Sequence, residues 1–276
     1  MTSDSTMTSD STISVLRDVL RVYDHRYLDL DRVQRDRLVE GTRHVLGEEG
    51  LSDAARAALP ASVRLRAFCI QHGLREELER LIRDEAEGSP AGAVVVGGRV
   101  YALYPYLRGV SRQDADITGE VGVDHRLDAA CWQGKRVRLR GEAVLQRVET
   151  HRTAVDVVLR ERTSGREHGF PAEHREPGSG GFESFVDPAV LAPGRWDVHV
   201  TVTALGVTRD ARFGSVRAPR FKPVPQRRAI ENAPQEGGEP KEATLYFTKG
   251  GHLALLVTAR TRRLPLHTRV LRRLLR

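Results

Sequence analysis

The segment that decides the fold is GRWDVHVTVTA, residues 194–204. Apolar side chains occupy every second position from Trp196 to Ala204, and Asp197, His199 and threonines fill the positions between them. Successive side chains of a β-strand point to opposite faces of the sheet, so this alternation predicts a strand with one buried face. Such a strand needs neighbours of the same kind, and they occur on both sides of it in the chain.

The neighbouring runs alternate in the same way and are separated by turn signals such as Gln133-Gly134 and Pro193-Gly194. Because no helical pattern interrupts these runs, the sequence predicts an antiparallel β-sandwich rather than a parallel sheet. We expect the following parts: a sandwich domain over 91–218 that starts with a hairpin turned at Gly97-Gly98, a Pro/Gly-rich loop over 219–242, and a hairpin over 243–259 that completes the sandwich.

Residues 13–88 follow a different period. Apolar residues recur at spacings of three and four, as in Leu16, Leu20 and Tyr23, which is typical of amphipathic helices. Asp31 is expected to begin a second helix as its N-cap and Gly47 to end it. The short connections predict a helical bundle, and the duplicated MTSDST of residues 1–12 is expected to be disordered. The fold class is therefore an α+β multidomain chain, helical first and β-rich afterwards.

Composition excludes several classes of protein. The chain has 276 residues and a mass of 30.8 kDa, which allows one large domain or two ordinary ones. It contains no apolar stretch of the ~20 residues that a membrane span needs, and the first residues do not form a secretory signal. Cys69 and Cys131 are too few for a disulfide framework or a cysteine-based zinc site. A cytoplasmic location with reduced thiols is the simplest expectation.

The positive charge is concentrated at one end. The net charge is +7, and residues 260–276 hold seven arginines and no acidic residue, so the rest of the chain is neutral. A basic amphipathic tail of this kind can dock on an anionic membrane surface or on a partner protein, or it can remain a solvated helix. Nucleic-acid binding is a weaker alternative because the neutral body offers no second contact surface. The docking residues that we single out are Arg262, Arg263, Arg269, Arg272, Arg273 and Arg276.

Catalytic patterns are missing from the sequence. It has no glycine-rich phosphate loop, no Gly-x-Ser-x-Gly elbow and no zinc-binding histidine spacing. The triplets Asp29-Leu30-Asp31 and Asp114-Ala115-Asp116 resemble paired metal-binding carboxylates, but helix capping explains the first and a polar loop the second. His168 and His174 lie with three glutamates in a stretch that we interpret as a solvated hairpin loop. We expect no catalytic residue, no metal site and no cofactor, and the alternative is an enzyme of unknown type that uses these loop groups.

Three aromatic residues are candidates for glycan binding, since aromatic rings can stack on sugar rings. They are Trp132, which precedes a turn, and Tyr104 and Tyr106 in the expected hairpin. A structural role in the core is the competing interpretation of all three. Trp196 is in phase with the valines of its strand and is assigned to the core.

The sequence resembles a known family at this level of detail. The helical stretch from VLRVYDHRYLDLDRV to LREELERLI is similar to the linker region that follows the catalytic domain in bacterial family 2 glycosyltransferases of the wall-teichoic-acid type. The segments GGRVYALYPYLR, GKRVRLRGEAVL, GFESFVDPAVLAPGRWDVHV and ATLYFTKGGHLALLV resemble the immunoglobulin-like C-terminal modules of those enzymes. The resemblance runs from about residue 13 to residue 258.

The resemblance implies a non-catalytic accessory module of a cell-envelope polymer glycosyltransferase. In the family, such modules are associated with oligomerisation and with positioning the acceptor polymer, and no catalytic residue carries over to this chain. The implied partners are a second copy of the chain, a glycosyltransferase catalytic chain, a polyanionic glycopolymer and the inner face of the membrane. The alternative is that the chain is part of an active family 2 enzyme whose catalytic domain lies outside it, as in a truncated or split gene product.

Overall fold

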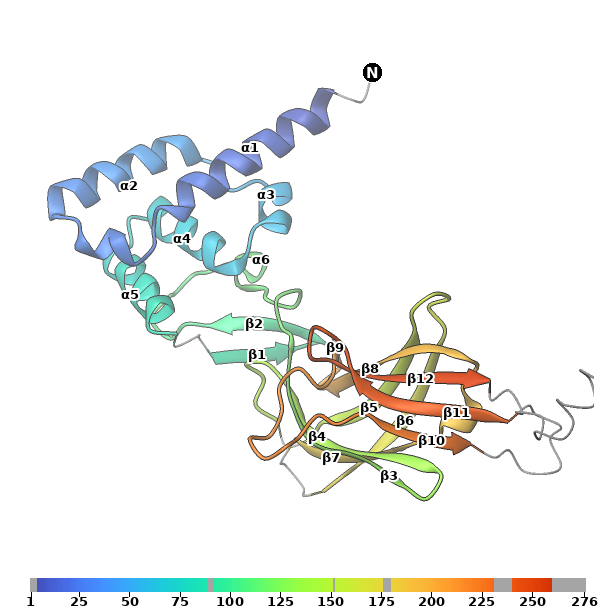
Figure 1. The fold of residues 1–276 in the computed structure, drawn as a ribbon. Coiled ribbons are helices and arrows are strands. Elements are labelled where there is room, and N and C mark those ends of the chain that lie inside the picture. Colours follow the sequence, from blue (N-terminus) through green and yellow to red (C-terminus); the bar gives the residue numbers. More distant parts are fainter. Residues whose placement is uncertain (1–3, 89–91, 151, 176–179, 231–239, 260–276) are drawn as a thin grey trace, which may run out of the picture. The chain divides into compact units, whose positions relative to one another are not determined.

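The computed structural model describes residues 4–88, 92–150, 152–175, 180–230 and 240–259. The chain divides into two compact units (Figure 1). The helical unit comprises residues 1–121 with 147–149, and the β unit comprises residues 122–146 with 150–276. The predicted order of a helical region followed by an antiparallel β region is confirmed.

The described residues of the helical unit form five helices of one to five turns, a 3-10 turn and a further single-turn helix. They are α1 (Asp4–Arg21), η1 (His25–Asp29), α2 (Arg32–Leu46), α3 (Asp53–Ala58), α4 (Ala61–Gln71), α5 (Arg75–Ala86) and α6 (Arg112–Ala115). Helix α1 begins inside the segment 1–12 that we expected to be disordered. The amphipathic face that carries Leu16 and Leu20 is buried, and the helix extends from it toward the N-terminus.

The ends of α2 follow the sequence prediction. The Asp31 carboxylate accepts a hydrogen bond from the Gln34 backbone N–H at 2.8 Å, and the Gln34 side chain accepts one from the Asp31 N–H at 3.1 Å. This capping box satisfies two backbone donors that a helix start otherwise leaves without partners. Gly47 ends the helix with φ 69°, a left-handed conformation that glycine adopts without strain.

Aromatic and aliphatic side chains from α1, η1, α2 and α4 form the core of the helical unit. Tyr23 and Tyr27 are almost completely buried, with ring centroids 5.1 Å apart. The Tyr23 hydroxyl donates a hydrogen bond to the Thr42 hydroxyl oxygen at 2.7 Å, so the buried phenol keeps a partner.

A two-stranded antiparallel hairpin belongs to the helical unit. Strands β1 (Gly92–Val96) and β2 (Arg99–Leu103) pair through the predicted Gly97-Gly98 turn. We expected this hairpin to lead the sandwich, but in the described residues it pairs with no strand of the β unit. Val100 is fully buried, and its carbonyl accepts a hydrogen bond from the Ile117 N–H at 2.9 Å. This backbone hydrogen bond ties the hairpin to the loop that ends the helical unit.

In the part of the β unit that the structure describes, there are ten antiparallel strands and the 3-10 turn η2 (Pro188–Val190). The strands are β3 (Val123–Gln133), β4 (Arg136–Leu145), β5 (Ala154–Glu161), β6 (Glu167–His174), β7 (Gly181–Val186), β8 (Gly194–Ala204), β9 (Val207–Arg212), β10 (Gln226–Ile230), β11 (Lys241–Phe247) and β12 (Leu253–Ala259). Their order in the sheet is β10-β11-β12-β8-β5-β6-β7-β4-β3, and β9 also pairs with β8.

Strand β8 has the predicted alternation. Trp196, Val198, Val200 and Val202 are at most 1% exposed, and they point into the core of the β unit. Trp196 donates its indole N–H to the Ala192 carbonyl at 3.0 Å, and its ring lies against His168 with centroids 5.3 Å apart. The core assignment of Trp196 is therefore confirmed.

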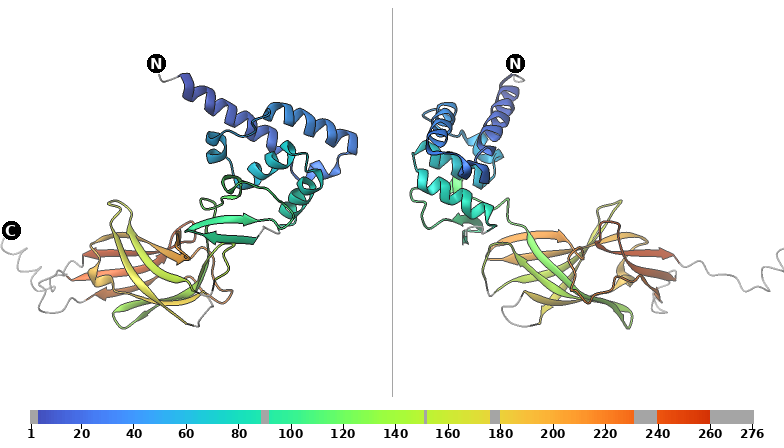
Figure 2. Two further views of the ribbon diagram at one scale, coloured as in Figure 1. Left: turned by 180° about the vertical axis from the view of Figure 1, so that it is seen from behind. Right: turned by 60° about the vertical axis from the view of Figure 1, so that its left-hand side comes forward.

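The sheet curls until its two ends meet (Figure 2). Strand β6 pairs with β5 through residues 167–171 and with β7 through residues 172–174. It therefore connects the part of the sheet that contains β5 and β8 to the part that contains β7 and β4. At the other side, the Trp132 indole donates to the Gln226 carbonyl at 3.3 Å, and the Gln226 amide donates to the Ala130 carbonyl at 3.0 Å. These two bonds join β3 to β10 and make the sheet nearly barrel-like.

Strand β10 lies within the stretch 219–242 that we expected to be a loop. It pairs in register with β11, with Arg228 opposite Ala243. The sequence QRRAI does not alternate, which is why its strand was not recognised. The backbone of β10 forms a strand because it pairs with β11, and pairing with a distant strand leaves no local pattern in the sequence.

Gly141 gives the first testable prediction. A Cβ atom at this position of β4 would collide with the Arg126 carbonyl and lie 2.8 Å from Phe213. We expect Gly141→Ala to lower the free energy of unfolding by about 1–3 kcal/mol, the usual cost of overpacking. Gly169→Ala is the matched control, because a Cβ there meets nothing within 4 Å. Equal stability of the two variants in urea denaturation would contradict the prediction.

Candidate functional site

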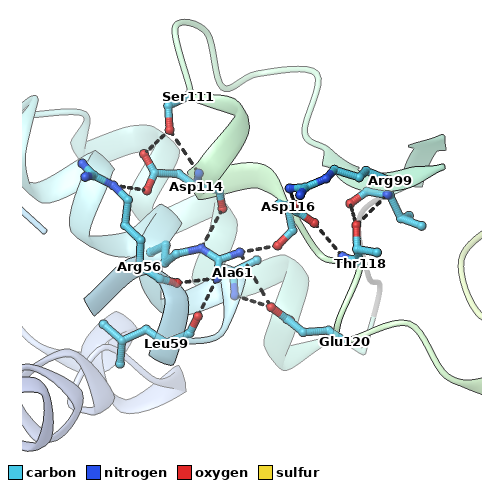
Figure 3. Close-up of polar contacts among 11 residues, drawn as sticks. Arg56, Leu59, Ala61, Arg99, Ser111, Asp114, Asp116, Thr118 and Glu120 are labelled. Carbon is cyan, nitrogen blue, oxygen red and sulfur yellow. Dashed lines mark hydrogen bonds and ion pairs between the residues drawn. The ribbon is translucent and has the colours of Figure 1, made fainter. Parts of the chain in front are cut away.

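A groove of about 850 Å³ lies on the helical unit. Three segments form it: the stretch from α3 to the start of α4, the turn of the β1–β2 hairpin, and the loop from α6 to Glu120. Charged side chains dominate its walls, including Arg56, Arg99 and Asp116. The polar contacts among these walls decide what the groove can do chemically (Figure 3).

The Asp114-Ala115-Asp116 triplet faces arginines and a hydroxyl group rather than one another. Arg56 Nε donates to Asp114 Oδ1 at 3.0 Å, and the Ser111 hydroxyl donates to Asp114 Oδ2 at 2.7 Å. Asp116 pairs with Arg99 at 3.0 Å. Both carboxylates are therefore engaged in structural contacts that join the loop to α3 and to the hairpin (Figure 3).

The electrostatics of Asp116 follow from these contacts. Burial alone raises the pKa of this carboxyl, but hydrogen bonds from Thr118 and the Arg99 guanidinium outweigh burial and hold the pKa below its usual value. The Thr118 backbone N–H donates to Asp116 Oδ1 at 2.8 Å. Asp116 is thus an ionised structural acceptor and not a general acid.

Arg64 is the centre of the network, and sequence reasoning missed it. Its side chain is buried and donates to four backbone carbonyl oxygens: those of Arg56 at 3.0 Å, Leu59 at 2.6 Å, Asp114 at 3.2 Å, and Asp116. The Glu120 carboxylate lies 3.9 Å from Arg64 Nη2 and also accepts the Ala61 N–H at 2.7 Å, at the start of α4. A guanidinium has five N–H donors, so these contacts leave Arg64 little capacity for a ligand.

The predicted aromatic residues lie in both units. Tyr104 and Tyr106 belong to the helical unit, with ring centroids 5.8 Å apart. The Tyr106 hydroxyl donates to Asp84 at 2.8 Å, and the Arg80 guanidinium lies 4.2 Å from the centre of its ring. Trp132 belongs to the β unit, where its indole N–H bonds to Gln226 and the Arg228 guanidinium lies 6.0 Å from its ring. All three aromatic residues therefore have protein partners, and Tyr104 in addition lines a cavity.

The stretch with His168 and His174 is strand β6 and not the loop that we expected. Arg160 Nε donates to the Glu167 carboxylate at 2.6 Å, and His168 packs on Trp196. The structured segments contain no group of three or more metal-ligating side chains. The tail arginines Arg262, Arg263, Arg269, Arg272, Arg273 and Arg276 lie outside the described residues.

A second polar cluster that sequence reasoning missed lies on the outer face of β5, β8 and β9. His199 is buried and lies 3.3 Å from Asp210, and burial followed by the Arg160 charge lowers its pKa. Asp197 pairs with Arg162 at 2.7 Å and with Arg212 at 3.0 Å. Cross-strand pairs of this kind stabilise a sheet face. The alternation of β8 predicted that His199 lies on the face opposite Trp196, but no sequence pattern indicated which residues would contact it.

Comparison with known proteins identifies the family. The model of the family described as TarS beta-glycosyltransferase C-terminal domain 1 matches residues 116–257. The chain belongs to this family. The match extends from the loop before β3 almost to the end of β12, and it confirms the resemblance found in the sequence.

A solved structure of TarS shares the fold. The structure entitled "Crystal structure of S. aureus TarS 217-571" has a TM-score of 0.53 at 12% identity, and the match covers 92% of this chain and 76% of that one. A longer S. aureus TarS structure has a TM-score of 0.47 at 14% identity, and this chain spans 48% of its length. No curated protein matches the chain. Among the described helices, none has the length and apolar character needed to cross a membrane.

Proposed function

We propose that this chain is a non-catalytic accessory module of a cell-envelope polymer glycosyltransferase, and that it holds catalytic domains together in an oligomer. Membership of a family defined by the C-terminal domain of a glycosyltransferase is the observation that carries this proposal. The pairing within the groove supports it, because Asp114, Asp116 and Arg64 act as structural groups. A module that assembles or positions other domains needs rigidity rather than reactive side chains.

The mass of the purified full chain in solution tests the assembly role. We expect light scattering to give a multiple of 30.8 kDa, and the same multiple for a chain that ends at residue 259. We also expect no sugar transfer from nucleotide-sugars by the chain alone. A monomer at all concentrations that also fails to bind a TarS-type catalytic domain would contradict the assembly role, and sugar transfer by the chain alone would contradict its non-catalytic character.

The arginine-rich tail supports a second role, docking on the polyanions of the inner membrane face. Residues 260–276 carry seven arginines without an acidic residue, and each basic residue near an anionic membrane contributes about 1 kcal/mol of binding free energy. Acceptor polymers with phosphate groups carry the same charge, so the tail suits both partners. Peripheral attachment at this face accounts for the tail better than a free location in the cytoplasm.

Deletion of residues 260–276 tests this role. We expect the full chain to sediment with vesicles that contain anionic lipid, and the truncated chain to lose nearly all of that binding. Replacing the six docking arginines by lysine keeps the charge and should keep the binding, while a rise in salt should weaken it because exposed charges are screened. Binding that survives the deletion would assign the contact to another surface. Preferential binding of the tail to duplex DNA would favour the nucleic-acid alternative.

We also propose that the β unit is a variant of the immunoglobulin-like sandwich. The order β3-β4-β7-β6 corresponds to strands A, B, E and D of the constant-type domain, and β5-β8-β9 corresponds to C, F and G. In this interpretation β10, β11 and β12 are an added edge that extends the second layer. An experimental structure in which β6 pairs with neither β5 nor β7 would contradict this assignment.

A further inference from the structure

A second cavity of the helical unit, of about 410 Å³, lies beside Tyr104. Its volume falls within the ~300–1,000 Å³ that is typical of small-molecule sites. It adjoins the network around Arg64, because Glu120 borders both the groove and this cavity. The residues that line it are Ala61, Ser62, Glu85, Gly88, Ala102, Tyr104, Ile117, Glu120 and Arg147.

The walls of this cavity combine one aromatic ring with hydrogen-bonding groups of both kinds. Tyr104 is the aromatic residue, Ser62 brings a hydroxyl group, and Ala102 and Ile117 add apolar surface. The Glu85 side chain contacts Arg66 through Oε2, while its Oε1 is buried without a hydrogen-bond partner in the described structure. Buried polar atoms are normally hydrogen-bonded, so this carboxylate oxygen is a site at which a ligand in the cavity can donate a hydrogen bond.

Arg147 reaches the cavity from the turn after β4 in an unusual backbone conformation. Its φ of 63° lies in the left-handed region that glycine prefers, and backbone strain of this kind persists mainly at functional sites. Arg147 also influences the pKa of the Tyr104 hydroxyl group. Burial, followed by the Glu85 charge, raises the Tyr104 pKa, and the Arg147 charge and hydrogen bond oppose the rise.

From this arrangement we propose that the cavity binds one neutral sugar residue. The Tyr104 ring lies against the C–H face of the sugar, the Glu85 and Glu120 carboxylates accept hydrogen bonds from its hydroxyl groups, and Arg147 donates to its oxygen atoms. Glu85 Oε1 lacks a hydrogen-bond donor, which a sugar hydroxyl group supplies and a phosphate dianion does not, so the lining favours a neutral glycosyl unit over a phosphate group. This activity goes beyond the assembly role and does not depend on it.

Amide chemical shifts of the full chain, recorded during titration with glucose, N-acetylglucosamine and glucose 6-phosphate, test the proposal. A single sugar ring has few atoms, so we expect dissociation constants in the millimolar range for the neutral sugars. The shifts should be confined to the start of α4, the end of α5 and the neighbourhood of Tyr104. Glucose 6-phosphate should bind more weakly than glucose, because its phosphate group replaces a hydroxyl group and offers no donor to the Glu85 carboxylate.

Three variants separate binding from folding. Tyr104→Ala should weaken binding at least ~10-fold, whereas Tyr104→Phe keeps the ring and should keep most of it. Arg147→Gly suits the left-handed backbone and should leave the fold intact while weakening binding. Tyr101→Ala is the control from the nearby strand β2, outside the cavity, and should bind as the unmodified chain does.

Some outcomes would overturn the proposal. They are the absence of shifts with both neutral sugars at concentrations well above the millimolar range, equal binding by folded Tyr104→Ala, and tighter binding of the phosphorylated sugar. The mass of each sample, measured in parallel, reports on assembly independently. A chain that assembles without binding sugar contradicts this inference alone, and a monomer that binds sugar contradicts the assembly role alone.

Discussion

Replacing Arg64 by methionine is expected to unfold the helical unit under conditions in which the β unit stays folded. Methionine has a similar length but donates no hydrogen bond, so four backbone carbonyls lose the guanidinium that they share. Each buried carbonyl left without a donor costs about 1–3 kcal/mol, and some of these groups can recruit water. We therefore expect a loss of about 3–5 kcal/mol in the free energy of unfolding of this unit.

The two tryptophans make the measurement specific. Trp132 and Trp196 are the only tryptophans of the chain, and both belong to the β unit. Helical circular dichroism therefore reports on the helical unit and tryptophan fluorescence on the β unit. In urea, the Arg64→Met variant should lose its helical signal at a much lower concentration, while the fluorescence transition should change little.

Two further variants test the hydrogen-bond geometry. Arg64→Lys keeps the charge but lacks the planar fork that reaches several carbonyls at once, so it should lose more than half of the same stability. Arg37→Met is the control, because Arg37 is exposed on α2, and its effect should stay within about 0.5 kcal/mol. A small effect of Arg64→Met, or parallel shifts of both signals, would contradict the role that we assign to Arg64.

Local patterns predicted the elements that depend on neighbouring residues. The strand at 194–204 could be recognised because one of its faces is buried along its whole length. The capping box at Asp31 could be recognised because both partners lie within three residues. The expectation that Tyr104 and Tyr106 bind a glycan stays a prediction, and the contacts of the Tyr106 hydroxyl and ring with Asp84 and Arg80 could not be read from sequence neighbours.

Features that depend on distant partners were not predictable in the same way. Arg64 lies on a helix with buried residues on most sides, and two of its carbonyl partners are 50 or more residues away in the chain. Strand β6 contains Gly169 and Pro171, which are turn signals, yet it remains a strand. Pro171 lies where β6 leaves β5 and turns to β7, a position at which its missing N–H breaks no continuous ladder.

Truncation of Trp196 is expected to destabilise the β unit as strongly as the loss of Arg64 destabilises the helical unit. The indole is fully buried, bonds to the Ala192 carbonyl and packs on His168. Trp196 lies on β8, which pairs with β5, β9 and β12, so a cavity at this position affects the centre of the curled sheet. Replacement of a buried tryptophan by alanine typically costs about 3–5 kcal/mol.

Fluorescence of the remaining Trp132 measures the effect of Trp196→Ala, and helical circular dichroism should stay near that of the unmodified chain. Trp196→Phe keeps a ring but loses the N–H donor, so we expect it to cost about 1–3 kcal/mol, the penalty for an unpaired buried carbonyl. That variant keeps the test valid if the alanine variant does not fold. Trp132→Phe is the matched control, since Trp132 is only partly buried and should matter less. A larger loss of stability for Trp132→Phe than for Trp196→Phe would contradict this prediction. It would mean that the junction of β3 and β10, where the sheet closes, contributes more to the stability of the β unit than the core around β8 does.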